Sequence, residues 1–330
     1  MSPRQSRQAE LVPKLLKNAK SWSSIELTVE NTTHQYGTLA KGGVPRFEMR
    51  LEYIETDRGQ RKLRETQTLG ETEGPVTEVF SDGERSALVR YHPVDGKLVQ
   101  ESINVTRSFY SEVLTGYTDR PVPLRYDYVG LVPLHEAIVG ARFLGDSEVI
   151  GRTCGVFLFP KNRPNDTLDL VYHIDWDHGL PLRVEYHRTG RAEEGRPNAA
   201  WEAKAIEKYD GRPLVSSSKY AAFDTRNGDG RSVTLEIDHS IVSARFDLAY
   251  PSTMFWYQAG PGVHVVDAPG GKTYDTPGVA PVAAKTGAPI VVEPPDPGRL
   301  PRIATWVSLA LAAVIVITLA ARRIRGGIRS

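Results

Sequence analysis

The sequence predicts a mainly β, α+β fold: one large antiparallel sheet, two short helices and a single C-terminal transmembrane helix. Apolar and polar residues alternate with period two along many short segments, as in strands with one buried face. The connections between these segments are short and contain Gly, Asn, Asp or Pro, which suits antiparallel neighbours. Strands do not alternate with helices along the chain, so a parallel sheet is not expected.

Composition restricts the class of protein. The chain has 330 residues, of which 40% are hydrophobic and 25% charged, as in globular proteins, and it could hold one large domain or two ordinary ones. A formal net charge of +1 gives no reason to expect a nucleic-acid partner. The single cysteine, Cys154, excludes an internal disulfide and a thiolate metal cluster. It lies in the apolar run 153–159, and we therefore expect it to be a small buried side chain.

Two helices are predicted. The first covers 9–22, with Leu11, Leu15, Leu16, Ala19 and Trp22 three or four residues apart, and requires Pro13 to lie in its first turn. The second covers 131–143, begins at Pro133 and turns Leu134, Ile138, Ala141 and Phe143 inward.

Strands are predicted wherever the alternation is clear. The segments are 25–30, 47–54, 61–69, 76–80, 87–91, 149–150, 153–159, 168–175, 182–187, 200–209, 214–223, 233–237 and 244–248. Residues 103–114 fit either a helix or a loop. The hairpin 168–185 is the clearest of these units, because Asp177, His178, Gly179 and Pro181 interrupt two alternating runs with turn-forming residues.

The C-terminal part has a different composition. Residues 259–302 are rich in Pro and Gly and predict a semi-extended linker. Ile303 to Ala321 contains neither a charged residue nor a proline; as a helix it would span ~28 Å, close to the thickness of the hydrocarbon core of a bilayer. A buried core helix is the alternative, but few globular helices are apolar on every face. The predicted organisation is a domain at 9–258, a linker at 259–302, a transmembrane helix at 303–321 and a basic tail at 322–330.

The orientation of the predicted anchor follows from charge. Four arginines at 322, 323, 325 and 329 favour a cytoplasmic tail and an extracytoplasmic, periplasmic domain. The first residues contain no apolar signal-peptide core. Either an upstream signal is missing from this sequence, or the protein is tail-anchored with its domain in the cytoplasm.

Motifs for catalysis, metal binding or cofactor binding are missing from the sequence. It contains no HExxH, no GxSxG, no Walker loop and no GxGxxG before a helix. Asp224 to Gly230 does not fit a calcium loop, because Arg226 and Gly228 occupy ligand positions. His173, Asp175, Asp177 and His178 surround a turn, where such residues are common for backbone reasons. We therefore expect no catalytic residue, no metal, no cofactor and no enzymatic activity.

Three segments carry a resemblance to a known family. They are FSDGERSALVRY at 80–91, DSEVIGRTCGVFLF at 146–159 and HIDWDHGLPLRVEY at 173–186. Together with an N-terminal helix before a long antiparallel sheet, they resemble the LolA/LolB lipoprotein carriers and the related RseB-type sensor domain, over about residues 10–250. The resemblance implies a strongly curved sheet that forms an incomplete barrel, with helices covering its mouth. It also implies a concave apolar surface that takes up acyl chains or a lipoprotein segment without covalent chemistry.

The resemblance also implies candidate residues for a ligand groove on the inward face. They are Leu27, Val29, Phe47, Leu51, Tyr91, Val156, Leu170, Tyr172, Val184 and Leu235. The alternative is that these residues fill a solid core. A tethered protein cannot carry cargo between membranes, so we expect a fixed, membrane-anchored binding domain for a lipid, lipoprotein or other apolar ligand. The alternative function is a protein-interaction or envelope-sensor module that regulates a membrane protein partner and binds no ligand.

Overall fold

The computed structural model describes residues 3–37, 46–69, 72–94, 97–106, 120–122, 124–129, 132–159, 168–192, 197–224 and 232–276. Within them the fold is mainly β, with few helices. The strands of the first half are β1 (Ser24–Gln35), β2 (Arg46–Thr56), β3 (Arg61–Leu69), β4 (Thr72–Ser81), β5 (Ser86–Val94) and β6 (Lys97–Thr106). Those of the second half are β9 (Arg142–Val149), β10 (Arg152–Phe159), β11 (Leu168–Asp175), β12 (Pro181–Arg188), β13 (Ala199–Tyr209), β14 (Arg212–Phe223) and β15 (Val233–Phe246). β16 (His264–Asp267) and β17 (Lys272–Asp275) follow.

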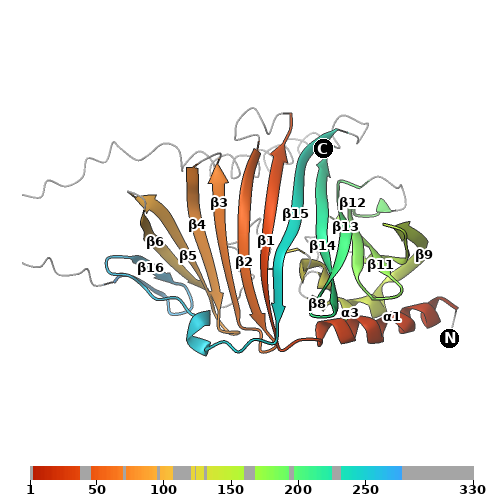
Figure 1. Cartoon of the computed structure of the whole chain (residues 1–330), viewed down its shortest axis with the longest axis horizontal. Helices are drawn as coiled ribbons and strands as arrows, with labels where there is room; N and C mark the ends of the chain where they lie inside the picture. Colours follow the sequence, from red (N-terminus) through yellow and green to blue (C-terminus); the bar gives the residue numbers. More distant parts are fainter. Residues whose placement is uncertain are drawn as a thin grey trace, which may run out of the picture. The chain divides into compact units, whose positions relative to one another are not determined.

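These strands form one 15-stranded sheet in the order β17-β16-β6-β5-β4-β3-β2-β1-β15-β14-β13-β12-β11-β10-β9 (Figure 1). All neighbours are antiparallel except β6 and β16, which are parallel. Two runs of consecutive neighbouring strands, β1 to β6 and β9 to β15, are joined where β15 pairs with β1. The predicted antiparallel sheet is therefore confirmed. The described strands do not close a barrel, because the order ends at β9 and at β17.

The N-terminal helix is longer than predicted. Helix α1 spans Pro3–Ala19, and Pro13 lies inside it rather than in its first turn. A proline at this position removes one hydrogen bond of the helix. Leu11 and Leu15, on either side of it, are buried against the sheet, so tertiary packing holds both turns in place.

The mid-chain helix is shorter than predicted. Only Leu134–Ala137 is α-helical (α3), followed by a 3₁₀ turn, η3, at Ile138–Gly140. Leu134, Ile138 and Ala141 are buried as expected, but Phe143 belongs to β9. Just before α3 lie the 3₁₀ turn η2 (Leu124–Asp127) and a two-stranded sheet of β7 (Tyr128–Val129) and β8 (Val132–Pro133). α3 contacts both α1 and η2.

Buried side chains form three clusters. The first core lies between α1, η2, α3 and strands β10 to β14, and includes Leu11, Tyr126, Tyr172 and Trp201. The second core lies on β1 to β5 and β15 and includes Leu27, Tyr53 and Leu124 of η2. The third contains Phe80, Ala87, Val89, Ile103, Val105, Val263 and Val265, with Trp256 and Tyr257 packed against it.

Several strand boundaries differ from the predictions. Residues 103–106, which fitted a helix or a loop, belong to β6, and residues 142–149 form β9. Residues 233–237 and 244–246 are parts of one strand, β15, which ends at Phe246, two residues before the predicted end. Residues 264–267 and 272–275, placed in the predicted linker, form β16 and β17, and the 3₁₀ turn η5 spans Ser252–Phe255.

The predicted C-terminal segments are outside the described residues. This applies to the linker from residue 277 onward, to the anchor at 303–321 and to the basic tail at 322–330. Among the helices that the structure describes, none combines the length and the apolar character needed to cross a bilayer.

Candidate functional site: the helix-side face of the sheet and its polar cleft

One face of the sheet lies beneath the helices, and we call it the helix-side face. Its orientation follows from strand register, because directly opposed residues of neighbouring strands point to the same face. A row on this face runs across β10 to β15, β1 and β2. Its members are Phe157, Tyr172, Val184, Trp201, Tyr220, Ile237, Thr33 and Phe47.

The β10 to β13 end of this row is a filled core. Phe157, Tyr172, Val184 and Trp201 are buried in the first core, beneath Leu11 and Leu15 of α1. The ring of Tyr126 stacks on Trp201 with a centroid distance of 4.3 Å. At Tyr172 and Val184, the structure therefore agrees with the alternative reading that these positions fill a core.

The other groove candidates fall into three groups. Leu27, Val29 and Leu51 are buried in the second core. Phe47, Leu170 and Leu235 lie on the helix-side face and are partly exposed. Tyr91 and Val156 point to the opposite face of the sheet. Tyr91 there donates a hydrogen bond to Glu78 (2.7 Å), so the structure does not bring all ten candidates together.

Several partly exposed apolar side chains of the helix-side face lie on neighbouring strands. Leu170 opposes Tyr186, the rings of Tyr186 and Tyr220 are 6.2 Å apart, and Tyr220 opposes Ile237. Leu235 lies two residues before Ile237 on β15 and therefore on the same face. We call this set, with Phe47, the apolar strip: Phe47, Leu170, Tyr186, Tyr220, Leu235 and Ile237.

A cleft of about 480 Å³ opens on the same face, between the end of α1, the β2–β3 turn and the segment from η2 to α3. It is lined by Ala19, Lys20, Trp22, Glu55, Thr56, Asp57, Gly59, Arg61, Arg120, Leu124, Asp127, Tyr128, Pro133 and His135. Ligand sites in proteins usually occupy 300 to 1,000 Å³, so the volume suits a small molecule or one end of a larger one.

Glu55 of β2 is the centre of the polar wall of the cleft. Arg120 donates to both of its carboxylate oxygens, from Nε at 3.0 Å and Nη2 at 2.6 Å. Arg61 Nε donates at 3.0 Å and Tyr53 Oη at 2.7 Å. Burial raises the pKa of Glu55, but these donors outweigh burial and the net pKa is lowered. Arg120 thus ties the segment before η2 to the sheet through a buried ion pair.

Three further residues, Tyr128, Asp127 and Thr56, complete this wall. The guanidinium of Arg120 lies over the Tyr128 ring at 3.8 Å, a cation–π contact. Burial raises the pKa of Asp127 to about 7, although Arg120 lowers it. The hydroxyl of Thr56 is buried, with no hydrogen-bond partner within the described structure. The wall can therefore exchange hydrogen bonds with the polar end of a ligand.

The hairpin at 168–188 is a structural unit. Asp175 is buried; its Oδ2 lies 2.8 Å from His178 Nδ1 and 3.2 Å from Arg152 Nη1, while its Oδ1 accepts from the Asp177 amide. The turn also holds α1, because Lys14 and Asn18 donate to the carbonyls of Trp176 and His178. These acidic and histidine side chains shape a turn, as the sequence suggested.

Cys154 is also inert in this setting. It is buried, and burial together with Asp175 raises the pKa of its thiol to about 12. A thiol that stays protonated at neutral pH is a poor nucleophile. In the described part of the chain, no three His, Cys, Asp or Glu side chains are placed to hold a metal ion.

The sequence reasoning missed Glu55, Arg120 and Asp127. The sequence did contain one signal for Glu55. It follows Leu51 and Tyr53 at period two, so the alternation places its carboxylate on the buried face, where it needs a partner. Arg120 carries no such signal, because its partner is 65 residues away in the chain.

Comparison with known proteins gives similarities of fold only. No family model matches the chain, and no curated protein matches it. It is similar to the crystal structure of a DUF1329 family protein from Desulfovibrio piger, with 12% identity, a TM-score of 0.49, and coverage of 78% of this chain and 98% of that one. A putative outer membrane lipoprotein-sorting protein domain from Vibrio parahaemolyticus has 15% identity, a TM-score of 0.47 and coverage of 76% and 97%. A LolA superfamily protein from Nitrosomonas europaea has 11% identity, a TM-score of 0.46 and coverage of 76% and 97%. The last two carry the family designations that the sequence segments resemble. Because one fold hosts many functions, function is inferred below from the site itself.

Proposed function

We propose that the protein is a non-enzymatic binding domain that holds a lipid, a lipoprotein or another apolar ligand on the helix-side face. We also propose that residues 303–321 anchor it in a membrane, with the domain on the extracytoplasmic side. The apolar strip is the observation that carries this proposal. Its side chains share one face, and the rings of Tyr186 and Tyr220 contact each other. They are only partly covered, unlike the filled core beside them. A contiguous apolar surface of this kind marks a binding site.

The cleft supports the proposal. It lies on the same face as the apolar strip and combines Trp22 and Leu124 with the polar wall around Glu55. Sites for small molecules are typically apolar with a few placed polar groups. A ligand with an acyl chain would bury apolar area along the strip, at roughly 25 cal/mol per Å².

A photo-crosslinking experiment tests this function. The full chain in phosphatidylcholine nanodiscs is exposed to a diazirine-labelled acyl probe, and the labelled peptides are mapped by mass spectrometry. Labels are expected on β2, β11, β12, β14 and β15. Leu235→Asp places a charge in the strip and should reduce labelling at least about tenfold, since a charged group in an apolar site costs several kcal/mol.

Val242→Asp is the matched control. Val242 is on the same strand as Leu235 but is 51% exposed and outside the strip. Its substitution should leave labelling unchanged. Equal losses in both variants, or labels distributed over the whole surface, would show that the strip does not bind the probe.

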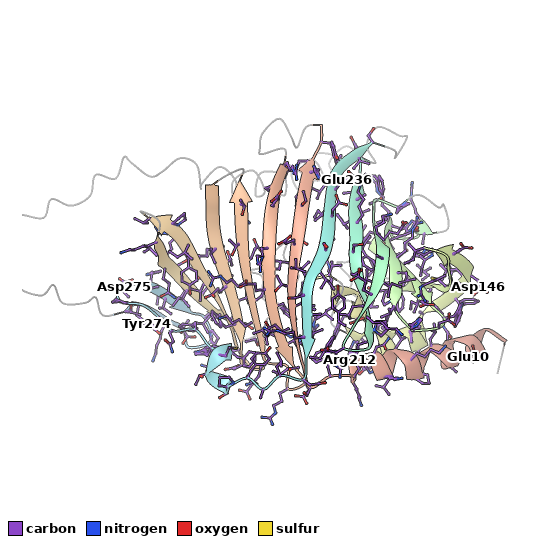
Figure 2. The ribbon with its side chains drawn as sticks, in the orientation of Figure 1. Glu10, Asp146, Arg212, Glu236, Tyr274 and Asp275 are labelled. Atoms are coloured by element: carbon purple, nitrogen blue, oxygen red, sulfur yellow. The ribbon has the colours of Figure 1, made fainter. Side chains whose placement is uncertain are left out.

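The sheet edges favour a second candidate function, a protein-interaction or sensor module. β9 and β17 lie at opposite ends of the sheet, where Figure 2 labels Asp146 on one and Tyr274 and Asp275 on the other. An edge strand offers unpaired backbone groups to a partner strand. Under this alternative, crosslinks from the full chain in membranes should map to an edge and to one partner, with no acyl probe on the strip.

A further inference from the structure

Arg125 differs from the other partly buried arginines that the structure describes. It lies in η2, between Leu124, which packs in the second core, and Tyr126, which packs in the first. Its guanidinium carbon is 5.7 Å from the centre of the Tyr126 ring. The side chain is only partly exposed and lies on the helix-side face of the sheet.

The surroundings of Arg125 are tyrosines. Burial lowers its pKa, but Tyr186, Tyr126, Tyr220 and Tyr172 raise it, with a net rise. Tyr186 and Tyr220 belong to the apolar strip. Arg125 is thus a permanent cation at the border of the strip.

In the part of the chain that the structure describes, no carboxylate pairs with this guanidinium. Arg120, five residues earlier, has two hydrogen bonds to Glu55. Arg61, Arg152, Arg183 and Arg212 are each in an ion pair with an acidic residue. Since burying an unpaired charge is costly, a cation kept in such a place calls for an anionic partner.

The nearby His239 neither adds a second positive charge nor neutralises that of Arg125. Burial and Arg125 lower the pKa of His239 to about 4, so its imidazole is neutral at pH 7. Its Nδ1 lies 2.7 Å from Asn31 Oδ1. Among the described residues, the polar groups around Arg125 are therefore tyrosine hydroxyls and a neutral imidazole, and the guanidinium keeps donors for an external anion.

We propose that Arg125 binds the acidic head group, a carboxylate or a phosphate, of an amphiphile whose acyl chain lies along the apolar strip. This rests on the proposed function and specifies its ligand class. A guanidinium suits both head groups, because its donors match two oxygens at once.

Matched probes test the proposal on the full chain in phosphatidylcholine nanodiscs. One probe is a diazirine-labelled hexadecanoic acid and the other the corresponding hexadecanol, identical except for the head group. Labelling of the strip by the acid should exceed labelling by the alcohol about tenfold, the factor expected for one charged hydrogen bond. Competition by unlabelled hexadecanoate or hexadecyl phosphate shows which head group is preferred.

Arg125→Gln should lower labelling by the acid to the level of the alcohol and leave labelling by the alcohol unchanged. Arg125→Lys, which keeps the charge, should retain part of the preference. The control is Arg50→Gln: Arg50 is exposed and faces Glu30 and Glu52.

The outcomes separate the two proposals. Equal labelling by acid and alcohol in the wild-type chain would overturn the role of Arg125 and leave the binding function intact. No labelling of the strip by either probe would overturn both. The ratio of acid to alcohol labelling in the wild-type chain tests the proposal even if the Arg125→Gln variant does not fold.

Discussion

Removal of Arg120 should destabilise the domain more than any exposed charge substitution. Arg120→Met keeps most of the side-chain length but removes both hydrogen bonds to Glu55. Glu55 is buried and retains Arg61 and Tyr53 as donors. Breaking a buried ion pair costs ~3–5 kcal/mol. Because Arg61 and Tyr53 still donate to Glu55, we expect the free energy of unfolding to fall by about 3 kcal/mol, the lower end of this range.

Urea unfolding of the full chain in a nonionic detergent, followed by tryptophan fluorescence, measures this loss. The control Arg50→Gln breaks an exposed pair and should cost less than about 0.5 kcal/mol. The pair is isolated by a double-mutant cycle with Glu55→Gln, in which the second substitution should cost much less than it does alone.

The pH dependence gives an independent check on Arg120. The pKa of Glu55 is lowered in the folded state, so its contribution is present above the pKa of the unfolded chain, about 4.3, and is lost as the pH falls through the folded value. The difference between wild type and Arg120→Met should therefore shrink below pH 4. If Arg120→Met costs no more than Arg50→Gln, or if the difference does not change with pH, the ion pair does not hold this segment on the sheet.

Three further predictions concern other positions. Burial raises the pKa of Asp127 from 3.8 to about 7, so the unfolded chain loses this proton at a lower pH than the folded chain. The free energy of unfolding of the wild type should therefore fall as the pH rises from about 4 to 7, by at most ~4 kcal/mol. Asp127→Asn should flatten this fall, measured as urea midpoints against pH, and an unchanged slope would contradict the prediction. Gly155→Ala would place a methyl carbon 2.6 Å from Trp176 and 2.7 Å from Phe157, and should cost about 1–3 kcal/mol, seen as a lower Tm; an unchanged Tm would show that these rings move freely. Leu15→Ala should cost about 2–5 kcal/mol, and a loss below 1 kcal/mol would mean that α1 is only loosely packed on the sheet.

The hairpin of β11 and β12 shows how much of the fold could be predicted. The alternation in residues 168–175 and 182–187 gave both strands nearly to their observed ends. Strand β15 was predicted in two pieces because Asp238, His239 and Ser240 interrupt its apolar residues. These polar residues do not end the strand, because their backbone groups pair with Lys219, Ser218 and Ser217 of β14.

The candidate site was predicted less well, and the reason is tertiary. Alternation gave the inward positions Leu27, Val29 and Leu51, but not whether helices would cover them. Tyr91 and Val156 looked equivalent to the others, and their place on the opposite face became visible only from the strand register. A shift of one residue moves a side chain to the other face, and no local pattern fixes that across the whole sheet.

The sequence by itself determined most of the strands, among them β2, β3, β11 and β12, and the turn chemistry that joins neighbours such as β11 and β12. Those properties depend on residues a few positions apart. Only the tertiary structure decided that β15 pairs with β1, that β16 adds to β6, that Arg120 reaches Glu55, and that Arg125 stands among tyrosines without a carboxylate in the described residues. Each of these contacts joins residues far apart in the chain, so it depends on the packing of the whole sheet rather than on any local pattern.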